Sequence, residues 1–349
     1  TALAARGHEV HFISYARPAR LSAFDPRVTF HRVEVSSYPL FRYPPYDLAV
    51  ASVVSEVAES RELDVLHAHY AIPHAVSAVL ARAMLGRDRP RIVTTLHGTD
   101  ITIVGTEREY FHPTRFGIDN SDAVTTVSSW LKDETERIFR PRREIRVIPN
   151  FVDTTRFRPM ECAATRESLG LGAELVLVHV SNLRPVKRVS DAVRILARLA
   201  AVRPARLVIA GDGPERKLAE EVARAEGVEE RVQFLGEQEH VEQVLACADL
   251  FLLPSESESF GLAALEAMAC GVPVIGTRSG GLPEVVEDGV SGRLHAVGDV
   301  AGAAARVLEV LATPGRLAAM GSAAREAAEQ RFAEARTVER YEALYRSLL

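Results

Sequence analysis

Residues 249–267 read DLFLLPSESESFGLAALEA. The first five residues are almost continuously apolar, which is typical of a parallel β-strand that is buried on both faces. A loop rich in serine and glutamate follows, and we expect a helix to begin near Gly261. A strand, a loop and a helix in this order predict one βα unit of a parallel sheet.

The same pattern repeats along the chain, because short apolar runs alternate with longer helical patterns. This alternation predicts βαβ units with right-handed crossovers. The expected strands cover residues 9–14, 28–35, 63–67, 91–96, 123–127, 145–148, 175–180, 206–210, 232–235, 249–253 and 273–276. A long helical tail, roughly residues 300–349, is expected to close the chain.

Two domains are expected, because 349 residues are more than one hydrophobic core usually organises. The pattern pauses over residues 150–174, which are rich in Pro, Thr and Arg and predict a linker. We therefore expect two Rossmann-like, doubly wound α/β domains that face a cleft, one over residues 1–153 and one over residues 154–332. Ligands of such sheets bind beyond the carboxyl ends of the strands.

The start of the chain differs from this pattern. A Rossmann-like domain normally opens with a strand and a glycine-rich turn before its first helix. Here the sequence opens with a helical stretch, residues 1–6, followed by Gly7 and a strand. The pattern predicts that a first strand and glycine-rich loop precede this chain in its parent protein.

Composition narrows the class of protein. The net charge is −5, which predicts no bulk attraction to nucleic acid or to acidic membranes. The three cysteines match neither a disulfide framework nor a paired metal motif, and they fit reduced thiols in a cytoplasm. No apolar run is long enough to span a bilayer, and no signal peptide is visible. We expect a cytoplasmic protein without nucleic-acid or membrane partners.

A basic loop follows the expected strand 175–180. It reads SNLRPVKR and contains Arg184 and Lys187. A diphosphate needs concentrated positive charge, which arginine supplies as forked donors and lysine as a point charge. A solvated basic loop is the alternative interpretation.

Two acids lie in and after the loop of residues 254–261. Glu258 precedes the expected helix, and Glu266 sits about one turn inside it. The backbone N–H groups at the start of the helix can receive a phosphate, and Gly261 lets the backbone approach closely. Glu266 is suited to bind ribose hydroxyls, and Glu258 the hydroxyls of a sugar. A capped surface helix with stray acids is the alternative.

Three glycine segments give weaker signals. Gly211 begins a tight turn that opens a helix, Gly236 ends a strand that could offer backbone groups to a base, and residues 280–284 (GGLPE) form a loop after a strand. Most such segments are only turns.

Polar residues end two expected strands of the first half. His67, His69 and Tyr70 follow one strand, and His97 to Asp100 follow the next. Such side chains, with Arg115 further along, can bind a hydroxylated or anionic acceptor. A divalent metal site built from His67, His69, His97 and Asp100 stays open as an alternative, although no acid–histidine spacing of a metal hydrolase accompanies it.

The second half resembles the family 4 retaining glycosyltransferases. The resemblance covers nearly the whole chain and is carried by the Glu258–Glu266 pair, the loop with Lys187, residues 211–215 (GDGPE), 271–273 (GVP) and 147–150 (VIPN). Within the family, the chain resembles the malate-using enzymes of bacillithiol synthesis. This closer resemblance is carried by residues 43–47 (YPPYD), 67–74 (HAHYAIPH) and 95–102 (TLHGTDIT).

The resemblance implies a GT-B fold, often a homodimer, with a final helix (about residues 333–349) that packs back on the first domain. It implies UDP-N-acetylglucosamine as donor, L-malate as acceptor and no metal or other cofactor. The implied catalytic residues are His97, Lys187, Arg184 and Glu258. Implied donor-binding residues are Arg184, Lys187, Gly211, Gly236, Glu258, Ser259, Phe260, Gly261, Leu262 and Glu266. Implied acceptor-binding residues are Tyr70, Thr99 and Arg115.

Three other functions remain open from the sequence. A related transferase would use another acceptor, such as an inositol phosphate or a glycan. A non-catalytic module would bind the nucleotide sugar without turnover, and a metal-dependent hydrolase would use the histidines. A dinucleotide oxidoreductase is disfavoured, because no G-x-G-x-x-G follows an expected strand.

Overall fold

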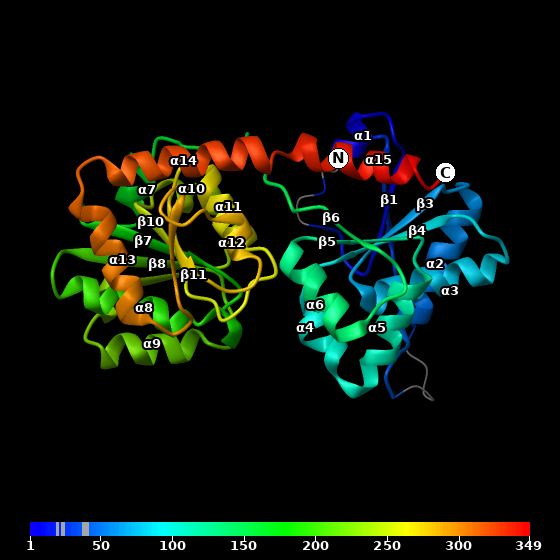
Figure 1. Cartoon of the computed structure of the whole chain (residues 1–349), viewed down its shortest axis with the longest axis horizontal. Helices are drawn as coiled ribbons and strands as arrows, with labels where there is room; N and C mark the ends of the chain where they lie inside the picture. Colours follow the sequence, from blue (N-terminus) through cyan, green and yellow to red (C-terminus); the bar gives the residue numbers. More distant parts are fainter. Residues whose placement is uncertain (19–20, 22–24, 37–41) are drawn as a thin grey trace. The chain divides into compact units, whose positions relative to one another are not determined.

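The computed structural model describes residues 1–18, 21, 25–36 and 42–349. The chain forms two compact units (Figure 1). The amino-terminal unit comprises Thr1–Pro149 and Ala335–Leu349, and the carboxy-terminal unit comprises Asn150–Glu334. The sequence placed the first boundary at 153/154, so the chain passes between the units a few residues earlier than expected.

Parallel strands form the sheets of the amino-terminal unit. A two-stranded sheet joins β1 (Val10–Ser14) and β2 (Val28–Arg32), and a four-stranded sheet has the order β3-β4-β5-β6. The strands of the larger sheet are β3 (Val65–His69), β4 (Arg91–Leu96), β5 (Ala123–Thr126) and β6 (Ile145–Val147). All four strands of the larger sheet were predicted to within two residues at each end, and β3 continues through His69 rather than ending at His67. Strand β2 ends at Arg32, three residues before the predicted end.

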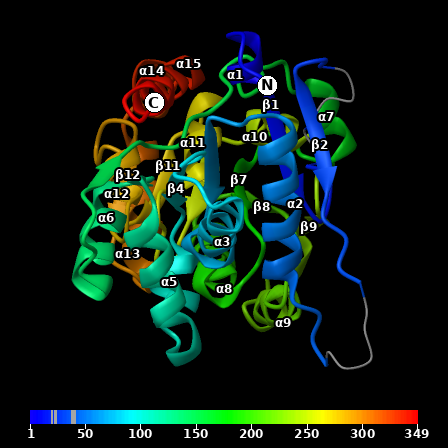
Figure 2. The same cartoon turned by 90° about the vertical axis from the view of Figure 1, so that its right-hand side faces the viewer.

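Helices cover this sheet and supply its core. They are α1 (Ala2–Ala5), α2 (Tyr46–Ser60), α3 (Val76–Leu85), α4 (Thr99–Thr102), α5 (Arg108–Asn120), α6 (Ser129–Phe139) and α15 (Glu334–Arg346), with short turns η1 (Ala71–Ala75) and η2 (Val104–Thr106). Figure 2 shows α2 beside α3, and their buried residues Val50, Val54 and Ala78 pack in one cluster with Leu66 of β3. Burial of this apolar face stabilises the helices more than their propensity does.

The carboxy-terminal unit contains one six-stranded parallel sheet with the order β12-β11-β10-β7-β8-β9. The strands are β7 (Leu175–Val180), β8 (Ala205–Ala210), β9 (Val232–Gly236), β10 (Leu250–Leu253), β11 (Val274–Thr277) and β12 (Gly292–His295). All four residues of β10 are buried, as the unbroken apolar run predicts. The prediction of doubly wound parallel sheets is confirmed for the central strands.

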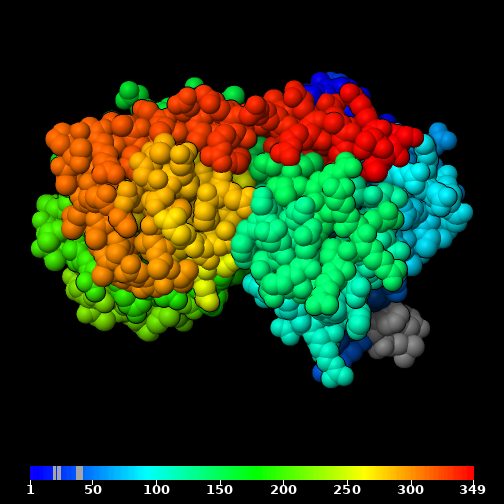
Figure 3. Space-filling model, in the orientation of Figure 1, coloured from blue at the N-terminus to red at the C-terminus, as the bar shows by residue number. Residues whose placement is uncertain are grey.

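Helices lie around this sheet. They are α7 (Ala163–Ser168), α8 (Val189–Ala200), α9 (Arg216–Ala225), α10 (Val241–Ala246), α11 (Leu262–Ala269), α12 (Leu282–Val285), α13 (Val300–Ala312) and α14 (Arg316–Arg331), with the turns η3 (Pro185–Lys187) and η4 (Glu229–Arg231). In Figure 3, α13 and α14 (orange) form part of the unit's surface. No helix among the described residues is both long and apolar enough to cross a membrane.

Two features of the carboxy-terminal region were not predicted. Strand β12 was missed, because its four residues include Gly292, Arg293 and His295 and show no apolar run. The helical tail expected over residues 300–349 is three helices, α13, α14 and α15, and α15 corresponds to the final helix of about residues 333–349 that the resemblance implies. The first break lies at Gly315, whose φ of 76° is left-handed, and the second lies at Phe332, whose backbone leaves the helical region.

Candidate functional site

A buried histidine fixes the start of the basic loop in the carboxy-terminal unit. His179 lies on β7 and is fully buried. Its Nδ1 donates to the carbonyl of Leu252 at 2.9 Å. The neutral ring then accepts at Nε2 from the hydroxyl of Ser181, at 2.8 Å. Burial lowers the pKa of His179 to about 4, so the ring is neutral at pH 7. No sequence pattern had singled out this histidine.

The hydrogen-bond chain continues into the loop itself. The backbone N–H of Leu183 donates to Ser181 Oγ at 3.2 Å, and the Leu183 side chain is fully buried. Further along, the N–H of Glu256 donates to the carbonyl of Val186 at 2.8 Å. The basic loop is therefore attached at both ends to strand tips rather than free in solvent.

The basic loop (residues 181–188) brings its lysine to the loop of residues 254–261, here called the acidic loop. Lys187 Nζ lies 2.7 Å from Glu258 Oε1, and Ser255 Oγ donates to the same oxygen at 2.7 Å. The Glu258 side chain is only 9% exposed. A carboxylate in such a largely dry setting needs a partner, and Lys187 compensates its charge. The structure thus brings together Lys187 and Glu258, which the sequence placed in separate motifs.

Helix α11 begins at Leu262, directly after Gly261 at φ 95°. Phe260 is buried and packs edge-on against Phe332, with ring centroids 5.6 Å apart. Glu266 lies one turn inside the helix and is half-buried, as Ser259 is in the loop before it. The helix has eight residues. The N–H groups of its first turn have no partners within the helix and point out of its amino-terminal end, where the acidic loop joins it.

The weaker glycine segments contact these two loops. Gly211 donates its N–H to the carbonyl of Gly236 at 2.7 Å, which uses one of the backbone groups that the sequence assigned to a base. A Cβ on Gly211 would lie 1.9 Å from the carbonyl oxygen of Ser181. The N–H of Gly281 donates to the carbonyl of Glu258 at 2.7 Å. All three segments therefore gather at one edge of the sheet, as parallel strands require.

The other cations of the basic loop have different surroundings. Arg188 forms an ion pair with Asp191, with its Nη2 2.6 Å from Oδ2. Arg184 is exposed, and its side chain makes no hydrogen bond or ion pair with the described residues. Arg184 is thus available to an anionic ligand, whereas Arg188 is held in place.

A second constellation lies at the tips of β3 and β4 in the amino-terminal unit. His69 Nδ1 and His97 Nε2 are 2.9 Å apart, and one of them donates to the other. The ring of Tyr70 lies 4.8 Å from that of His97, and Tyr70 adopts φ 77°, which is rare for a bulky residue. Adjacent parallel strands thus bring these side chains together, as the sequence predicts.

Asp100 does not act as a metal ligand in this arrangement. Its carboxylate accepts backbone N–H groups of Ala71 at 2.8 Å, of Gly98 at 2.9 Å and of His97 at 3.2 Å. It is 2% exposed and fastens the two strand tips to each other. Across the described ranges, no group of three or more His, Cys, Asp or Glu residues is arranged to hold a metal ion.

The remaining acceptor candidates lie on two helices. Thr99 is exposed at the first position of α4, after Gly98 at φ 120°. Arg115 lies on α5, where its Nε is 3.6 Å from Asp119 Oδ2 one turn further along. An incoming carboxylate would therefore compete with Asp119 for this arginine.

The histidines of this second constellation are neutral at pH 7. Burial, followed by the charge of His69, lowers the pKa of His97 to about 3. Burial, followed by the charge of His74, lowers the pKa of His69 to about 4. Neutral rings can offer a lone pair as well as an N–H to a hydroxylated ligand.

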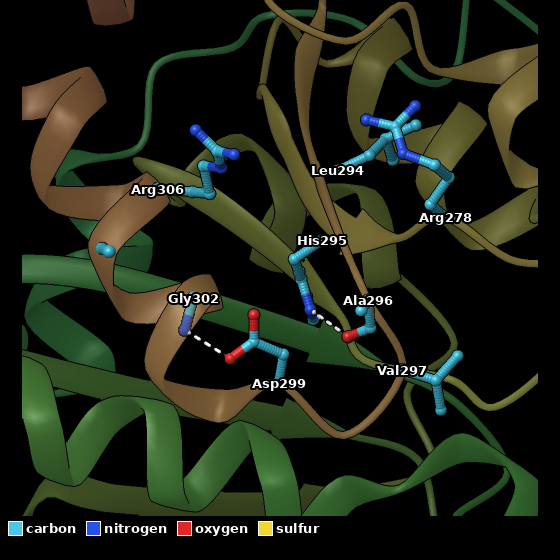
Figure 4. A pocket seen from close by; sticks show the side chains of 9 residues that line it. Arg278, Leu294, His295, Ala296, Val297, Asp299, Gly302 and Arg306 are labelled. Atoms are coloured by element: carbon cyan, nitrogen blue, oxygen red, sulfur yellow. Dashed lines mark hydrogen bonds between the residues drawn. The ribbon is translucent and has the colours of Figure 1, made fainter.

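A pocket of about 530 Å³ lies elsewhere, between β12 and the start of α13 (Figure 4). There His295 Nδ1 donates to the carbonyl of Ala296 at 2.9 Å, and Asp299 caps α13 through the N–H of Gly302 at 2.8 Å. None of the residues predicted from the sequence lines this pocket. It does not mark the candidate site.

Comparisons with known proteins agree with this architecture. The family model for glycosyl transferases group 1 matches residues 163–327, and the model for glycosyltransferase family 4 matches residues 1–156. The fold resembles that of sucrose-phosphate synthase from Thermosynechococcus elongatus, with a TM-score of 0.84 at 22% identity over 99% of this chain and 90% of that chain. It also resembles HepE of Anabaena, solved with UDP and glucose, with a TM-score of 0.76 at 23% identity over 92% and 86% of the two chains.

The chain is a glycosyltransferase of the GT-B fold and belongs to the family 4 glycosyltransferases. It is 45% identical to N-acetyl-alpha-D-glucosaminyl L-malate synthase of Bacillus anthracis, over 99% of this chain and 91% of the relative. It is 34% identical to a GDP-mannose-dependent phosphatidylinositol monomannoside mannosyltransferase of Mycolicibacterium smegmatis, over 83% and 79% of the two chains.

Proposed function

We propose that this chain transfers N-acetylglucosamine from UDP-N-acetylglucosamine to the hydroxyl of L-malate, with retention of the α configuration. The observation that carries the proposal is the 45% identity, over nearly the whole chain, to a relative named for this reaction. The reaction is the first step of bacillithiol synthesis. The paired Lys187 and Glu258 and the histidines at the tips of β3 and β4 supply the chemistry that the reaction needs.

In this proposal the carboxy-terminal unit holds the donor. Lys187 and the exposed Arg184 bind the diphosphate, and the first N–H groups of α11 bind a phosphate oxygen. Glu258 uses Oε1 for Lys187 and Ser255, and Oε2 receives no hydrogen bond from the described residues. Oε2 is thus the atom that would accept hydroxyls of the sugar. Glu266 binds the ribose hydroxyls, while Gly211 and Gly236 shape the wall of the site.

The amino-terminal unit would hold the acceptor. Tyr70, Thr99 and Arg115 bind the malate, the arginine through a carboxylate. His97 lies beside the reacting carbon of the donor. Because its ring is neutral at pH 7, it can accept from or donate to a sugar hydroxyl without adding a charge.

We infer same-face substitution as the mechanism. The malate hydroxyl attacks the anomeric carbon as the bond to the nucleotide breaks, and a leaving phosphate oxygen takes the hydroxyl proton. Positive charge at Lys187 stabilises the departing diphosphate, and the remaining catalysis comes from positioning. We propose that no metal takes part, which chelator-insensitive turnover would support.

The direct test is product analysis by mass spectrometry. The protein is incubated with UDP-N-acetylglucosamine and, in separate reactions, with L-malate, an inositol phosphate or an oligosaccharide. The proposal expects a product with the mass of N-acetylglucosaminyl malate and an equal release of UDP. Product with another acceptor alone would identify a different transferase, and UDP binding without release would identify a non-catalytic module.

The cellular setting is part of the proposal. We expect a homodimer that works in the cytoplasm without nucleic-acid or membrane partners. Sedimentation of the purified protein tests the dimer, and fractionation of cells tests the compartment.

Replacing Glu266 by alanine should weaken UDP binding. A carboxylate that accepts two ribose hydroxyls makes charge-assisted hydrogen bonds of about 1.5–3 kcal/mol each net, so a loss of at least tenfold in affinity is expected. Calorimetry with UDP measures it, and Glu221→Ala, an exposed acid on α9, is the control. Unchanged affinity for UDP would remove Glu266 from the ribose site.

Replacing Arg115 by alanine should raise the KM for malate about tenfold or more and leave the KM for the donor unchanged. The reason is that only the acceptor's carboxylate would need this guanidinium. Initial rates with each substrate varied in turn measure both constants. Arg108→Ala on the same helix is the control. A change in the donor constant alone would show that Arg115 serves the other half of the reaction.

A further inference from the structure

His69 and His97 form a hydrogen-bonded pair that the candidate mechanism uses only in part. Their facing nitrogens are 2.9 Å apart, and the ring centroids are 5.1 Å apart. The two residues end adjacent strands, so no local sequence pattern links them. The hydrogen bond fixes which way the His97 ring faces, because it occupies Nε2.

His69 is itself supported by His67, two residues earlier on the same strand, β3. Its ring stacks on that of His67, with centroids 4.5 Å apart and planes inclined by 23°. His67 is then held at both nitrogens. Nδ1 lies 2.6 Å from the hydroxyl of Tyr345, and Nε2 lies 2.7 Å from Thr95 Oγ1. A ring bonded at both ends cannot rotate freely and gives His69 a fixed surface.

The final helix supplies the outer support. Tyr345 lies on α15, 278 residues from His67 in the sequence. One turn earlier, Tyr341 reaches Thr95 Oγ1 at 3.0 Å. Burial raises the pKa of both tyrosines, so their hydroxyls stay protonated at pH 7. Helix α15 therefore does more than pack an apolar face. Two of its tyrosine hydroxyls contact His67 and Thr95, next to His69.

The titratable groups around the pair have hydrogen-bond partners of their own. His67 has a pKa well below its ordinary value, because it is buried beside two other histidines. His74 donates from Nδ1 to the carbonyl of His69 at 2.7 Å, and the Asp100 carboxylate faces backbone N–H groups. The orientation of His97 is therefore set by its hydrogen bond to His69 and by ring packing.

We propose that His69 is a positioning residue for His97, and that His67 and Tyr345 of α15 hold His69 in place. This inference rests on the proposed function, in which His97 lies beside the reacting carbon. Its physical reason is that a misplacement of about 1 Å at a reacting centre lowers the rate on the order of a hundredfold.

Three variants separate the hydrogen bond from general packing. His69→Ala removes the bond, and a fall in kcat of about 10- to 100-fold is expected. His69→Asn places an amide near the position of Nδ1 and should restore most of kcat. Tyr345→Phe removes one hydroxyl and should lower kcat by about three- to tenfold. His112→Ala, an exposed histidine on α5, is the matched control and should leave kcat unchanged.

The readouts distinguish positioning from folding. UDP affinity should stay near that of the wild type, because the variants lie in the amino-terminal unit. The thermal midpoint measures how much packing each variant loses. Nitrogen-15 NMR of His97 should show one tautomer in the wild type and exchange between two in His69→Ala. The acidic limb of the rate profile should move to higher pH in His69→Ala, because the cavity left by the ring hydrates His97.

Some outcomes overturn the proposal. They are unchanged kcat in His69→Ala, failure of His69→Asn to restore kcat, or an equal loss of UDP affinity. The NMR measurement does not depend on the acceptor, so it tests the inference even if malate proves to be the wrong substrate. Absence of product from the wild-type protein would contradict the proposed function instead.

Discussion

Lys187→Ala should lose at least 99% of turnover while the protein still folds. The lysine is the one cation of the basic loop whose ammonium group touches the acidic loop, 2.7 Å from Glu258 Oε1. Removing a preorganised charge that stabilises a leaving group costs roughly 3–4 kcal/mol, which corresponds to a hundredfold or more in rate. Release of UDP from the donor in the presence of malate measures the loss.

The same substitution also leaves a nearly buried carboxylate without its cation, and that cost must be separated from catalysis. Breaking a buried ion pair by removing one partner destabilises by roughly 3–5 kcal/mol in fully dry settings, and less here because Lys187 is 22% exposed. The double variant Lys187→Ala/Glu258→Gln removes both charges and should recover thermal stability but not turnover. Lys217→Ala on α9 is the matched control.

Recovery of turnover in the double variant would mean that Lys187 acts only by neutralising Glu258. Near-normal turnover in Lys187→Ala alone would contradict the assignment of the diphosphate to this loop. A partial rate in Lys187→Arg is expected, because the forked guanidinium keeps the charge but moves it.

Most strands of the two larger sheets could be predicted, because burial on both faces leaves an unbroken apolar run in the sequence. The run before Pro254 is such a case, and all four residues of β10 are buried. Strand β12 lies at the edge of its sheet and has no such run. It is recognised as a strand only from its pairing with β11 in the structure. Edge strands depend on their neighbours more than on their own composition.

Candidate site residues could be singled out from the sequence where the ligand chemistry calls for a particular side chain, such as a cation for a diphosphate. They could not be singled out where contacts with residues far away in the sequence determine what the side chain does. Lys187 and Glu258 were singled out as charges for a nucleotide sugar, and the structure brings them into contact. His179 was missed, because its partner Leu252 lies 73 residues away. Asp100 was considered as a metal ligand, and only the fold shows that backbone N–H groups occupy its carboxylate.

Gly211→Ala should be among the most damaging glycine-to-alanine substitutions in the carboxy-terminal unit. Gly211 has φ 115°, and a Cβ there would lie 1.9 Å from the carbonyl oxygen of Ser181. Left-handed backbone costs an L-residue roughly 1–2 kcal/mol, and overpacking adds about 1–3 kcal/mol. Since the clashing atom belongs to the backbone, no side-chain rotation relieves it.

Gly227→Ala is the control that separates these two costs. Gly227 also has a positive φ, 69°, but a Cβ there would meet nothing within 4 Å. It should show only the backbone cost, a fall in thermal midpoint of a few degrees. Gly211→Ala should lower the midpoint by about twice as much or more.

The position of the clash gives a second expectation. Ser181 begins the basic loop and is held by His179 at 2.8 Å, so pushing its carbonyl displaces the loop that carries Lys187. Gly211→Ala should therefore weaken UDP binding about tenfold or more, whereas Gly227→Ala should leave it unchanged. Calorimetry below the unfolding range of both variants measures this. Equal effects of the two substitutions on midpoint and on UDP affinity would show that the turn at Gly211 does not support the basic loop.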